Sequence, residues 1–294
     1  EYFIYDMSGK RLIDAHLNGG TYNLGHRNPE VVQAVTMAMQ HFDIGNHHFP
    51  SLARTALAEA LIKTAPAGLS KVIYGSGGGE AIDIALKTAR HATQKRKIVS
   101  IVKAYHGHTG LAVGTGDDRF SKLFLSDRPE EFPHVPFNDL EAMEDALRGR
   151  DVAAVIMETI PATYGFPLPN PGYLEAVKVL CEKYEALYIA DEVQTGWGRT
   201  GENFWGYQAH GLEPDILTFA KGLGNGLAMA GVVASASLMD SVNANSISTF
   251  GGNPLVCAGA LANLDFLMTN DLQTNSLRQG ETMFAKLRPL VDEL

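Results

Sequence analysis

Cysteine is scarce in this chain, and long apolar runs are missing from it. Only two cysteines, Cys181 and Cys257, occur among 294 residues, which excludes a disulfide scaffold and a C-x-x-C redox site. Both fall in helical patterns, so we expect packing residues in a reducing compartment. No apolar run approaches the roughly 20 residues of a membrane span, and no signal peptide is visible. The sequence therefore predicts a cytoplasmic protein without membrane contacts.

An excess of basic residues is also missing, because the formal net charge is −9. This charge offers no basic surface for nucleic acid or for an anionic membrane. Nucleotide-binding loops are excluded by spacing, since a dinucleotide fingerprint would require glycine where Glu80 stands, and no G-K-[ST] follows for a Walker loop. With 45% hydrophobic residues, the chain can nevertheless bury a large core.

Helical patterns and short apolar runs alternate along the chain. This alternation predicts an α/β fold with a mostly parallel sheet flanked by helices. The helical patterns cover residues 28–42, 52–64, 80–91, 140–147, 173–184, 253–267 and 275–290, and the apolar runs cover 72–74, 98–102, 152–157, 187–190, 216–219 and 230–234. Charge and proline between Arg119 and Pro136 indicate a long surface loop.

Two apolar runs end in one charge each before glycine-rich turns, the first at Asp191 and the second at Lys221. In a parallel sheet, both side chains would lie at the carboxyl edge, where open α/β sheets bind ligands. A desolvated lysine forms a Schiff base with an aldehyde, and pyridoxal phosphate needs an acid that keeps its ring nitrogen protonated. The plainer alternative is an aspartate that caps a turn and a lysine in solvent.

Glycines open the helical pattern that follows the apolar run 72–74. Gly78 and Gly79 would place bare N–H groups at a helix N-terminus, which is a typical phosphate cradle. A simple glycine-rich bend is the alternative. Tyr105 follows another apolar run and could stack on a cofactor ring at the same edge, or it could be an ordinary packing tyrosine.

The motifs around Asp191 and Lys221 resemble those of the class III aminotransferases, which use pyridoxal phosphate in the fold-type-I architecture. The resemblance rests on D-E-V-Q-T-G-W-G-R-T-G from residue 191 and P-D-I-L-T-F-A-K-G-L-G from residue 214. Further matches in family order are Y-D-M-S-G-K at 5–10, G-G-G-E-A at 77–81, Y-H-G at 105–107 and S-T-F-G-G-N-P at 248–254.

The resemblance assigns roles to single residues. It implies that Lys221 carries the cofactor as an internal aldimine, Asp191 pairs with the ring nitrogen, Val193 packs on one ring face and Gln194 approaches the ring hydroxyl. It also implies that Glu158 holds Gln194. His106 would help to position the ring. Thr249 would reach the cofactor phosphate of a neighbouring subunit, so the resemblance implies a homodimer with shared active sites.

Three positions depart from the family pattern. Gly77 and Gly79 stand where the family often has serine and threonine, so the backbone amides of Gly78 and Gly79 would hold more of the phosphate, with Ser76 as a possible further donor. Thr163 stands where relatives of ornithine aminotransferase have a second acid that pairs with a switchable arginine. How a dicarboxylic donor would be distinguished from an ω-amine is therefore open.

A metal site is the weaker interpretation of the histidines. His106 and His108 form an H-x-H pair, and His47 and His48 could add imidazoles, but no carboxylate or cysteine clusters with them at ligand spacing. We therefore expect no metal.

The resemblance also predicts the domain organisation. We expect an N-terminal segment over 1–45, a large cofactor-binding domain over 46–262, and a connecting helix with the start of an incomplete C-terminal domain over 263–294. Because the chain begins at Glu1 and ends before the family's further C-terminal domain, we expect a trimmed or truncated member.

The predicted activity is transfer of an amino group from an amine or amino acid to a 2-oxo acid by a ping-pong mechanism through a Lys221 Schiff base. Aminomutases, racemases and a decarboxylase share these motifs and remain alternatives. An inactive remnant with a binding or scaffold role is a third interpretation.

Overall fold

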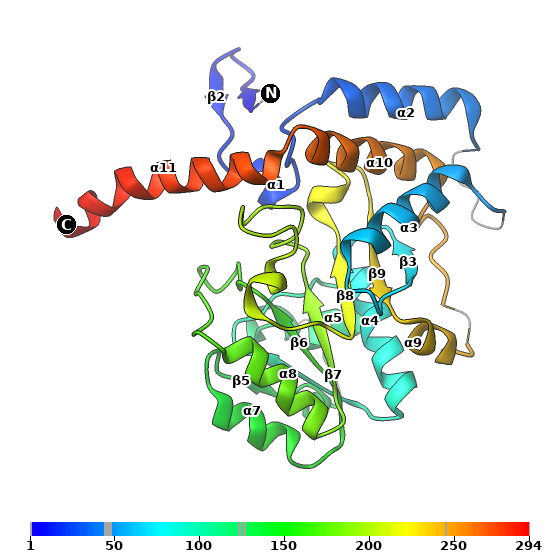
Figure 1. The fold of residues 1–294 in the computed structure, drawn as a ribbon, viewed down its shortest axis with the longest axis vertical. Coiled ribbons are helices and arrows are strands. Elements are labelled where there is room, and N and C mark those ends of the chain that lie inside the picture. The colour runs from blue at the N-terminus through cyan, green and yellow to red at the C-terminus, as the bar shows by residue number, and fades with distance from the viewer. Residues whose placement is uncertain (1, 44–48, 123–124, 126–127, 245, 294) are drawn as a thin grey trace.

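The computed structural model describes residues 2–43, 49–122, 125, 128–244 and 246–293, and it centres on a seven-stranded sheet (Figure 1). The order across the sheet is β3 (Lys71–Gly75), β9 (Ala230–Ala234), β8 (Ile216–Phe219), β7 (Leu187–Asp191), β6 (Val152–Glu158), β4 (Lys97–Ile101) and β5 (His134–Val135). Among these described strands, β9 alone runs in the direction opposite to the other six. The predicted mostly parallel α/β sheet is confirmed.

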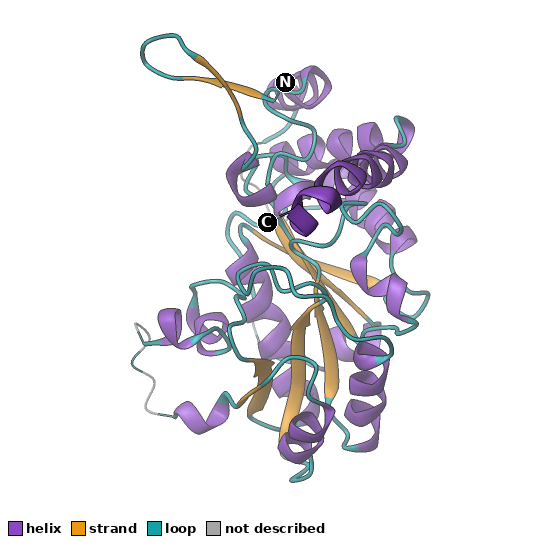
Figure 2. Cartoon of the chain, turned by 90° about the vertical axis from the view of Figure 1, so that its left-hand side faces the viewer, coloured by secondary structure: helices purple, strands orange, loops and turns teal. Residues whose placement is uncertain are grey.

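Helices cover both faces of this sheet (Figure 2). Every residue of β6 is buried, as expected for a central parallel strand, whose side chains meet a helix layer on either side. Alternate residues of β6 belong to different cores: Val155 and Met157 pack with the helix residues Leu174 and Val177, whereas Ile156 packs on the opposite face. The core therefore forms two layers, one on each side of the strands.

The helices on the two faces come from separate parts of the chain. One layer contains α4 (Gly78–Thr93), which packs against β8 and β9, together with the short α5 (Gly110–Gly114) and α9 (Ala236–Ser241). The other contains α7 (Leu140–Leu147) and α8 (Tyr173–Lys183). Cys181 and Cys257 are buried in α8 and α10 without a disulfide, which confirms their expected packing role.

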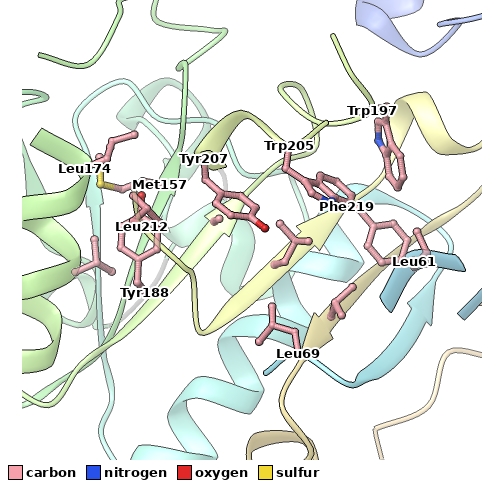
Figure 3. Close-up of a cluster of buried hydrophobic side chains, with 14 of the residues drawn as sticks. Leu61, Leu69, Met157, Leu174, Tyr188, Trp197, Trp205, Tyr207, Leu212 and Phe219 are labelled. Atoms are coloured by element: carbon pink, nitrogen blue, oxygen red, sulfur yellow. The ribbon is translucent and has the colours of Figure 1, made fainter. Parts of the chain in front are cut away.

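Aromatic rings extend one core layer towards the ligand-binding edge of the sheet. Figure 3 shows Trp197, Trp205 and Phe219 close together, and the ring centroids of the two tryptophans are 4.6 Å apart. Trp205 is fully buried, and its Nε1 donates to the carbonyl of Thr64, 3.0 Å away. Trp205 packs against the glycine-rich turn that follows β7, since a Cβ on Gly196 would lie 2.7 Å from its ring.

The N-terminal residues form a separate hairpin, β1 (Phe3–Tyr5) with β2 (Arg11–Ile13), followed by α1 (Leu17–Gly20) and α2 (Pro29–His41). Asn28 caps α2, since its side chain accepts from two backbone N–H groups, and Pro29 occupies the first turn. The helix α3 (Leu52–Thr64) follows in the chain. The C-terminal helices are α10 (Pro254–Thr269), which packs against α2 and α3, and α11 (Leu272–Glu293).

The two predicted domain boundaries can be compared with the helices of the structure. The limit at 45/46 lies outside the described residues, as do His47 and His48. The limit at 262/263 falls inside α10, which continues across it without interruption. The last helix begins at Leu272, three residues before the predicted start.

The predicted surface loop over 119–136 is wrong in part. The segment contains the end of α6 (Asp118–Ser121), the 3-10 turn η1 (Pro129–Glu131) and the edge strand β5. Phe132 is 7% exposed, and β5 pairs with β4 through His134 and Val135. Charged residues and prolines dominate the composition of this segment. The two apolar residues that reach the core, Phe132 and Val135, are too few to give a strand pattern in the sequence.

Candidate active site

The predicted acidic and basic residues meet at the carboxyl edge of the sheet. Glu158 is the last residue of β6 and stands directly opposite Asp191 of β7. Asp191 in turn is opposite Thr218 of β8, and Lys221 follows three residues later at the start of the 3-10 turn η3 (Lys221–Leu223). Lys221 has a φ of 37°, an uncommon conformation for a residue with a side chain and one that gathers at functional sites.

These residues line a cavity of about 430 Å³. Its walls contain nine of the ten predicted site residues, namely Gly78, Gly79, Tyr105, His106, Glu158, Asp191, Val193, Gln194 and Lys221. Thr249 is the tenth; it is exposed and is not part of this wall. The structure therefore brings the set together within one chain, with Thr249 apart.

The Asp191 carboxylate is held in one orientation. Its Oδ2 lies 2.7 Å from Nδ1 of His106, and its Oδ1 accepts from the backbone N–H of Val193 at 3.1 Å. Asp191 and His106 are each 3% exposed. The other ring nitrogen of His106, Nε2, is buried and has no hydrogen-bond partner within the described structure. Through Nδ1, His106 can hold the Asp191 carboxylate in this orientation.

Glu158 lies close to Asp191, and burial together with that neighbouring carboxylate raises the pKa of Glu158 to about 7. From the described residues its carboxylate accepts only long hydrogen bonds, from the backbone N–H of Tyr105 at 3.4 Å and of Ala162 at 3.3 Å. Near neutral pH, Glu158 can therefore hold or release a proton inside the cavity. The ring hydroxyl of Tyr105 also has a raised pKa, chiefly because of burial.

The Lys221 amine is the one Lys or Arg side chain on the described cavity wall. Burial lowers its pKa and Arg199 lowers it further, while Asp191 and Glu158 act in the opposite direction. A lower pKa increases the fraction of unprotonated amine, which is the nucleophilic form. The cavity thus combines an activated amine with two buried carboxylates.

The N-terminus of α4 gives the cavity an anion-binding wall. Gly77 precedes the helix without a side-chain cap, and Gly78 and Gly79 form its first turn. A Cβ on Gly79 would lie 2.7 Å from Oγ1 of Thr109, so a side chain there would have to displace the Thr109 hydroxyl. Uncapped amides at the start of a 16-residue helix suit a phosphate group.

These observations fit pyridoxal phosphate. The phosphate would be held at Gly78 and Gly79, a protonated ring nitrogen would offset the buried Asp191 carboxylate, and the aldehyde would meet Lys221. Among the described residues, no group of three or more His, Cys, Asp or Glu is arranged to hold a metal ion. Within the same ranges, no helix is both long and apolar enough to cross a bilayer.

Several wall residues were not predicted. Gly19 and Thr21 come from the N-terminal segment, and Leu227, Ala228 and Met229 come from the turn before β9. Neither group carries a chemical signature, and their position depends on tertiary packing. Thr163 does line the cavity, and its hydroxyl donates to the carbonyl of Lys103 at 3.2 Å.

Comparison with known proteins gives consistent matches. The family described as aminotransferase class-III matches residues 1–293. An uncharacterized aminotransferase of Archaeoglobus fulgidus is 42% identical over 98% of this chain and 68% of its own length. The ornithine aminotransferase of Toxoplasma gondii, a structure with partial occupancy of pyridoxal phosphate, superposes with a TM-score of 0.91 at 28% identity over 98% of this chain and 70% of its own.

A third match is the taurine:2-oxoglutarate aminotransferase of Bifidobacterium kashiwanohense in complex with pyridoxal phosphate and glutamate. It has a TM-score of 0.91 and 29% identity, over 99% of this chain and 72% of its own. The chain is thus shorter than these relatives, as expected, and the predicted enzyme class and cofactor are confirmed. The chain belongs to the aminotransferase class-III family, whose members depend on pyridoxal phosphate.

Proposed function

We propose that this protein moves an amino group from an amine or amino-acid donor to a 2-oxo acid by a ping-pong mechanism in which Lys221 carries the cofactor. One observation carries the proposal: Lys221, Asp191 and the uncapped N-terminus of α4 all line the same cavity. The Bifidobacterium relative, which acts on 2-oxoglutarate, supports a 2-oxo acid as the acceptor.

Each wall has a distinct task in this proposal. Bound pyridoxal phosphate supplies an aldehyde that condenses with amines and a ring that withdraws electrons from the carbon next to nitrogen. Gly78 and Gly79 hold the phosphate through backbone N–H groups. Asp191, oriented by His106, keeps a proton on the ring nitrogen. Val193 and Tyr105 pack on the ring faces.

Lys221 acts twice. Its amine would hold bound pyridoxal phosphate through the aldehyde until the amino group of a donor takes its place. The free Nζ would then accept and return a proton beside the donor carbon, which requires an amine that can exist unprotonated near neutral pH. The direction of the Lys221 pKa shift, downwards through burial, supports both tasks.

Gln194 and Glu158 complete the proposed ring contacts. Gln194 would approach the ring hydroxyl, and Glu158 would hold Gln194 in place. Both lie on the cavity wall. Because the pKa of Glu158 is raised to about 7, this pair would be sensitive to pH near neutrality.

We also propose a cytoplasmic homodimer in which Thr249 completes the active site of the partner subunit. Thr249 and Phe250 are exposed just before α10. Nearby, a groove of about 580 Å³ is lined by apolar side chains of α3 and α10, including Leu52 and Leu261. Exposed apolar surface beside an exposed phosphate-binding candidate suits a second copy of the chain.

The test is a spectrum followed by a turnover assay. Pyridoxal phosphate added to the purified protein should give a visible absorption band that is absent in Lys221→Ala and is bleached by a productive amine donor. Stoichiometric consumption of an added 2-oxo acid would establish transamination. Release of carbon dioxide, or an isomer formed without consumption of oxo acid, would instead indicate a decarboxylase, an aminomutase or a racemase.

A further inference from the structure

Arg199 has an unusual environment beside the cavity. The side chain is largely buried, and burial lowers the pKa of its guanidinium. No carboxylate of the described residues lies within ion-pair distance of it. A buried guanidinium without an acidic partner is costly, so its contacts need another explanation.

Within the described part of the chain, every hydrogen bond of the Arg199 guanidinium goes to a neutral oxygen. Its Nε donates to the carbonyl of Gln194 at 2.6 Å. Its Nη2 donates to Oδ1 of Asn23 at 2.6 Å and also to the carbonyl of Gly20. The guanidinium thus joins the turn that carries Gln194 to a segment about 170 positions earlier in the chain.

We call residues 19–25 the N-terminal strap. Gly19 and Thr21 of the strap form part of the cavity wall. The side chain of Asn23 packs so closely on Gly222 that a Cβ there would overlap it. The strap therefore touches the residue next to Lys221.

The far end of the strap is held by a second residue. Asn225 accepts from the N–H of Leu24 at 3.0 Å and donates to the carbonyl of Gly25 at 3.1 Å. Arg199 holds the near end and Asn225 the far end. Arg199 is also tied to α11, since Ser276 Oγ donates to its carbonyl at 2.7 Å.

We propose that Arg199 is a positioning residue that fastens the N-terminal strap to the Gln194 turn and so closes the cavity at Gly19 and Thr21. A guanidinium suits this task because its fixed, planar set of donors can bond several carbonyls at once, which an ammonium cannot do with the same geometry. This role of Arg199 rests on the proposed function in one respect, namely that Lys221 carries the cofactor.

The charge of Arg199 has a second effect. The Lys221 amine faces Asp191 and Glu158, which favour its protonated form, and Arg199, which disfavours it. Arg199 bonds to Asn23, which packs on Gly222 next to Lys221, and its hydrogen bonds go to neutral oxygens, so no carboxylate of the described residues neutralises it. It therefore offsets part of the effect of the two acids.

Two substitutions separate the fastening from the charge. Arg199→Lys keeps the charge and loses the planar donors, and Arg199→Gln loses both. The control is Arg90→Lys, because Arg90 is a partly buried arginine that pairs with Glu131 at 3.1 Å, away from the cavity wall. Asn23→Ala removes one acceptor and leaves Arg199 intact, so it tests the strap if the Arg199 variants fold poorly.

The first readout is hydrogen exchange of the strap amides, measured on the purified protein with and without pyridoxal phosphate. We expect exchange of the Thr21, Leu24 and Gly25 amides to become about tenfold faster or more in both Arg199 variants, since each loses hydrogen bonds from a charged donor. Asn23→Ala should give a smaller increase, and adding it to Arg199→Lys should give little more. Unchanged strap exchange in Arg199→Lys and Asn23→Ala would overturn the proposal.

The second readout is the pH dependence of competitive acetylation of Lys221 by acetic anhydride in the cofactor-free protein, followed by mass spectrometry. The midpoint should rise in Arg199→Gln and stay close to wild type in Arg199→Lys and Arg90→Lys. Equal midpoints in all four proteins would overturn the electrostatic part. Both readouts are independent of turnover, so a protein with other chemistry would still give a clear answer about Arg199.

Discussion

At the residue scale, the chemistry depends on one amine. Replacing Lys221 by alanine removes both the cofactor attachment and the proton carrier, so turnover should fall by at least about a thousandfold. The visible band with pyridoxal phosphate should disappear as well. Steady-state rates and the absorption spectrum measure the two effects.

Lys183→Ala is a suitable control for this prediction. Lys183 is half exposed on α8 and pairs with Glu144, remote from the cavity wall, so its removal should leave the band and the turnover rate unchanged. A Lys221→Ala protein that kept the band would show that another amine carries the cofactor.

A second prediction at this scale concerns Glu158 and pH. Its pKa is raised to about 7, first by burial and then by Asp191. A carboxyl group whose pKa is higher in the folded state contributes stability below its unfolded pKa, and that contribution is lost as the pH rises through about 7. Glu158→Gln removes this loss, so the melting temperature of the variant relative to wild type should increase between about pH 5.5 and about pH 8.5.

Glu144→Gln is the matched control, because its carboxylate is stabilised by hydrogen bonds from Lys183 and Tyr184, which lower its pKa. Its effect should not change over the same pH range, where the group is ionised in both states. If the Glu158→Gln difference were also constant with pH, Glu158 would not titrate near neutrality in the folded protein.

At the scale of elements, the start of α4 depends on the loop that packs against it. Gly107 has a φ of 111°, and a Cβ on it would lie 2.6 Å from the Gly79 Cα. Gly107→Ala should therefore displace the backbone of the phosphate cradle and weaken binding of pyridoxal phosphate by about tenfold or more. Titration followed by absorbance gives the dissociation constant.

Gly68→Ala provides the comparison for this prediction. A Cβ at Gly68 would meet no atom within 4 Å, so this variant should bind the cofactor like wild type. Equal dissociation constants for both variants would mean that the loop after β4 does not shape the cradle.

The same scale shows what the sequence could predict. The order of elements and the site at Asp191 and Lys221 were predictable because parallel strands put their carboxyl ends at one edge. The neighbouring positions of Glu158 and Asp191 depend on the register between β6 and β7. The strand β5 and the packing of residues 19–25 beside Arg199 depend on long-range contacts. Such contacts leave no local pattern in the sequence. Arg199 therefore belongs to a recognised motif, but the sequence predicted no role for it.

At the scale of the whole molecule, the proposed sharing of active sites can be tested by mixing two inactive proteins. Thr249 is exposed and lies outside the cavity wall of its own chain. If it acts on the partner subunit, Thr249→Asp should repel the cofactor phosphate there and inactivate a homodimer. Lys221→Ala inactivates a homodimer through its own cavity.

A mixed dimer distinguishes the two arrangements. One of its cavities would lack Lys221 and face the altered residue 249, whereas the other would have Lys221 and receive Thr249 from the Lys221→Ala subunit. Unfolding and refolding an equal mixture should then restore about a quarter of the wild-type activity, because half of the dimers are mixed and each has one intact site. If Thr249 acted within its own chain, both cavities of the mixed dimer would be defective and no activity would return. The cavity in one chain would then have to be completed by residues of that chain, and the exposed position of Thr249 before α10 would have to change when the cofactor binds.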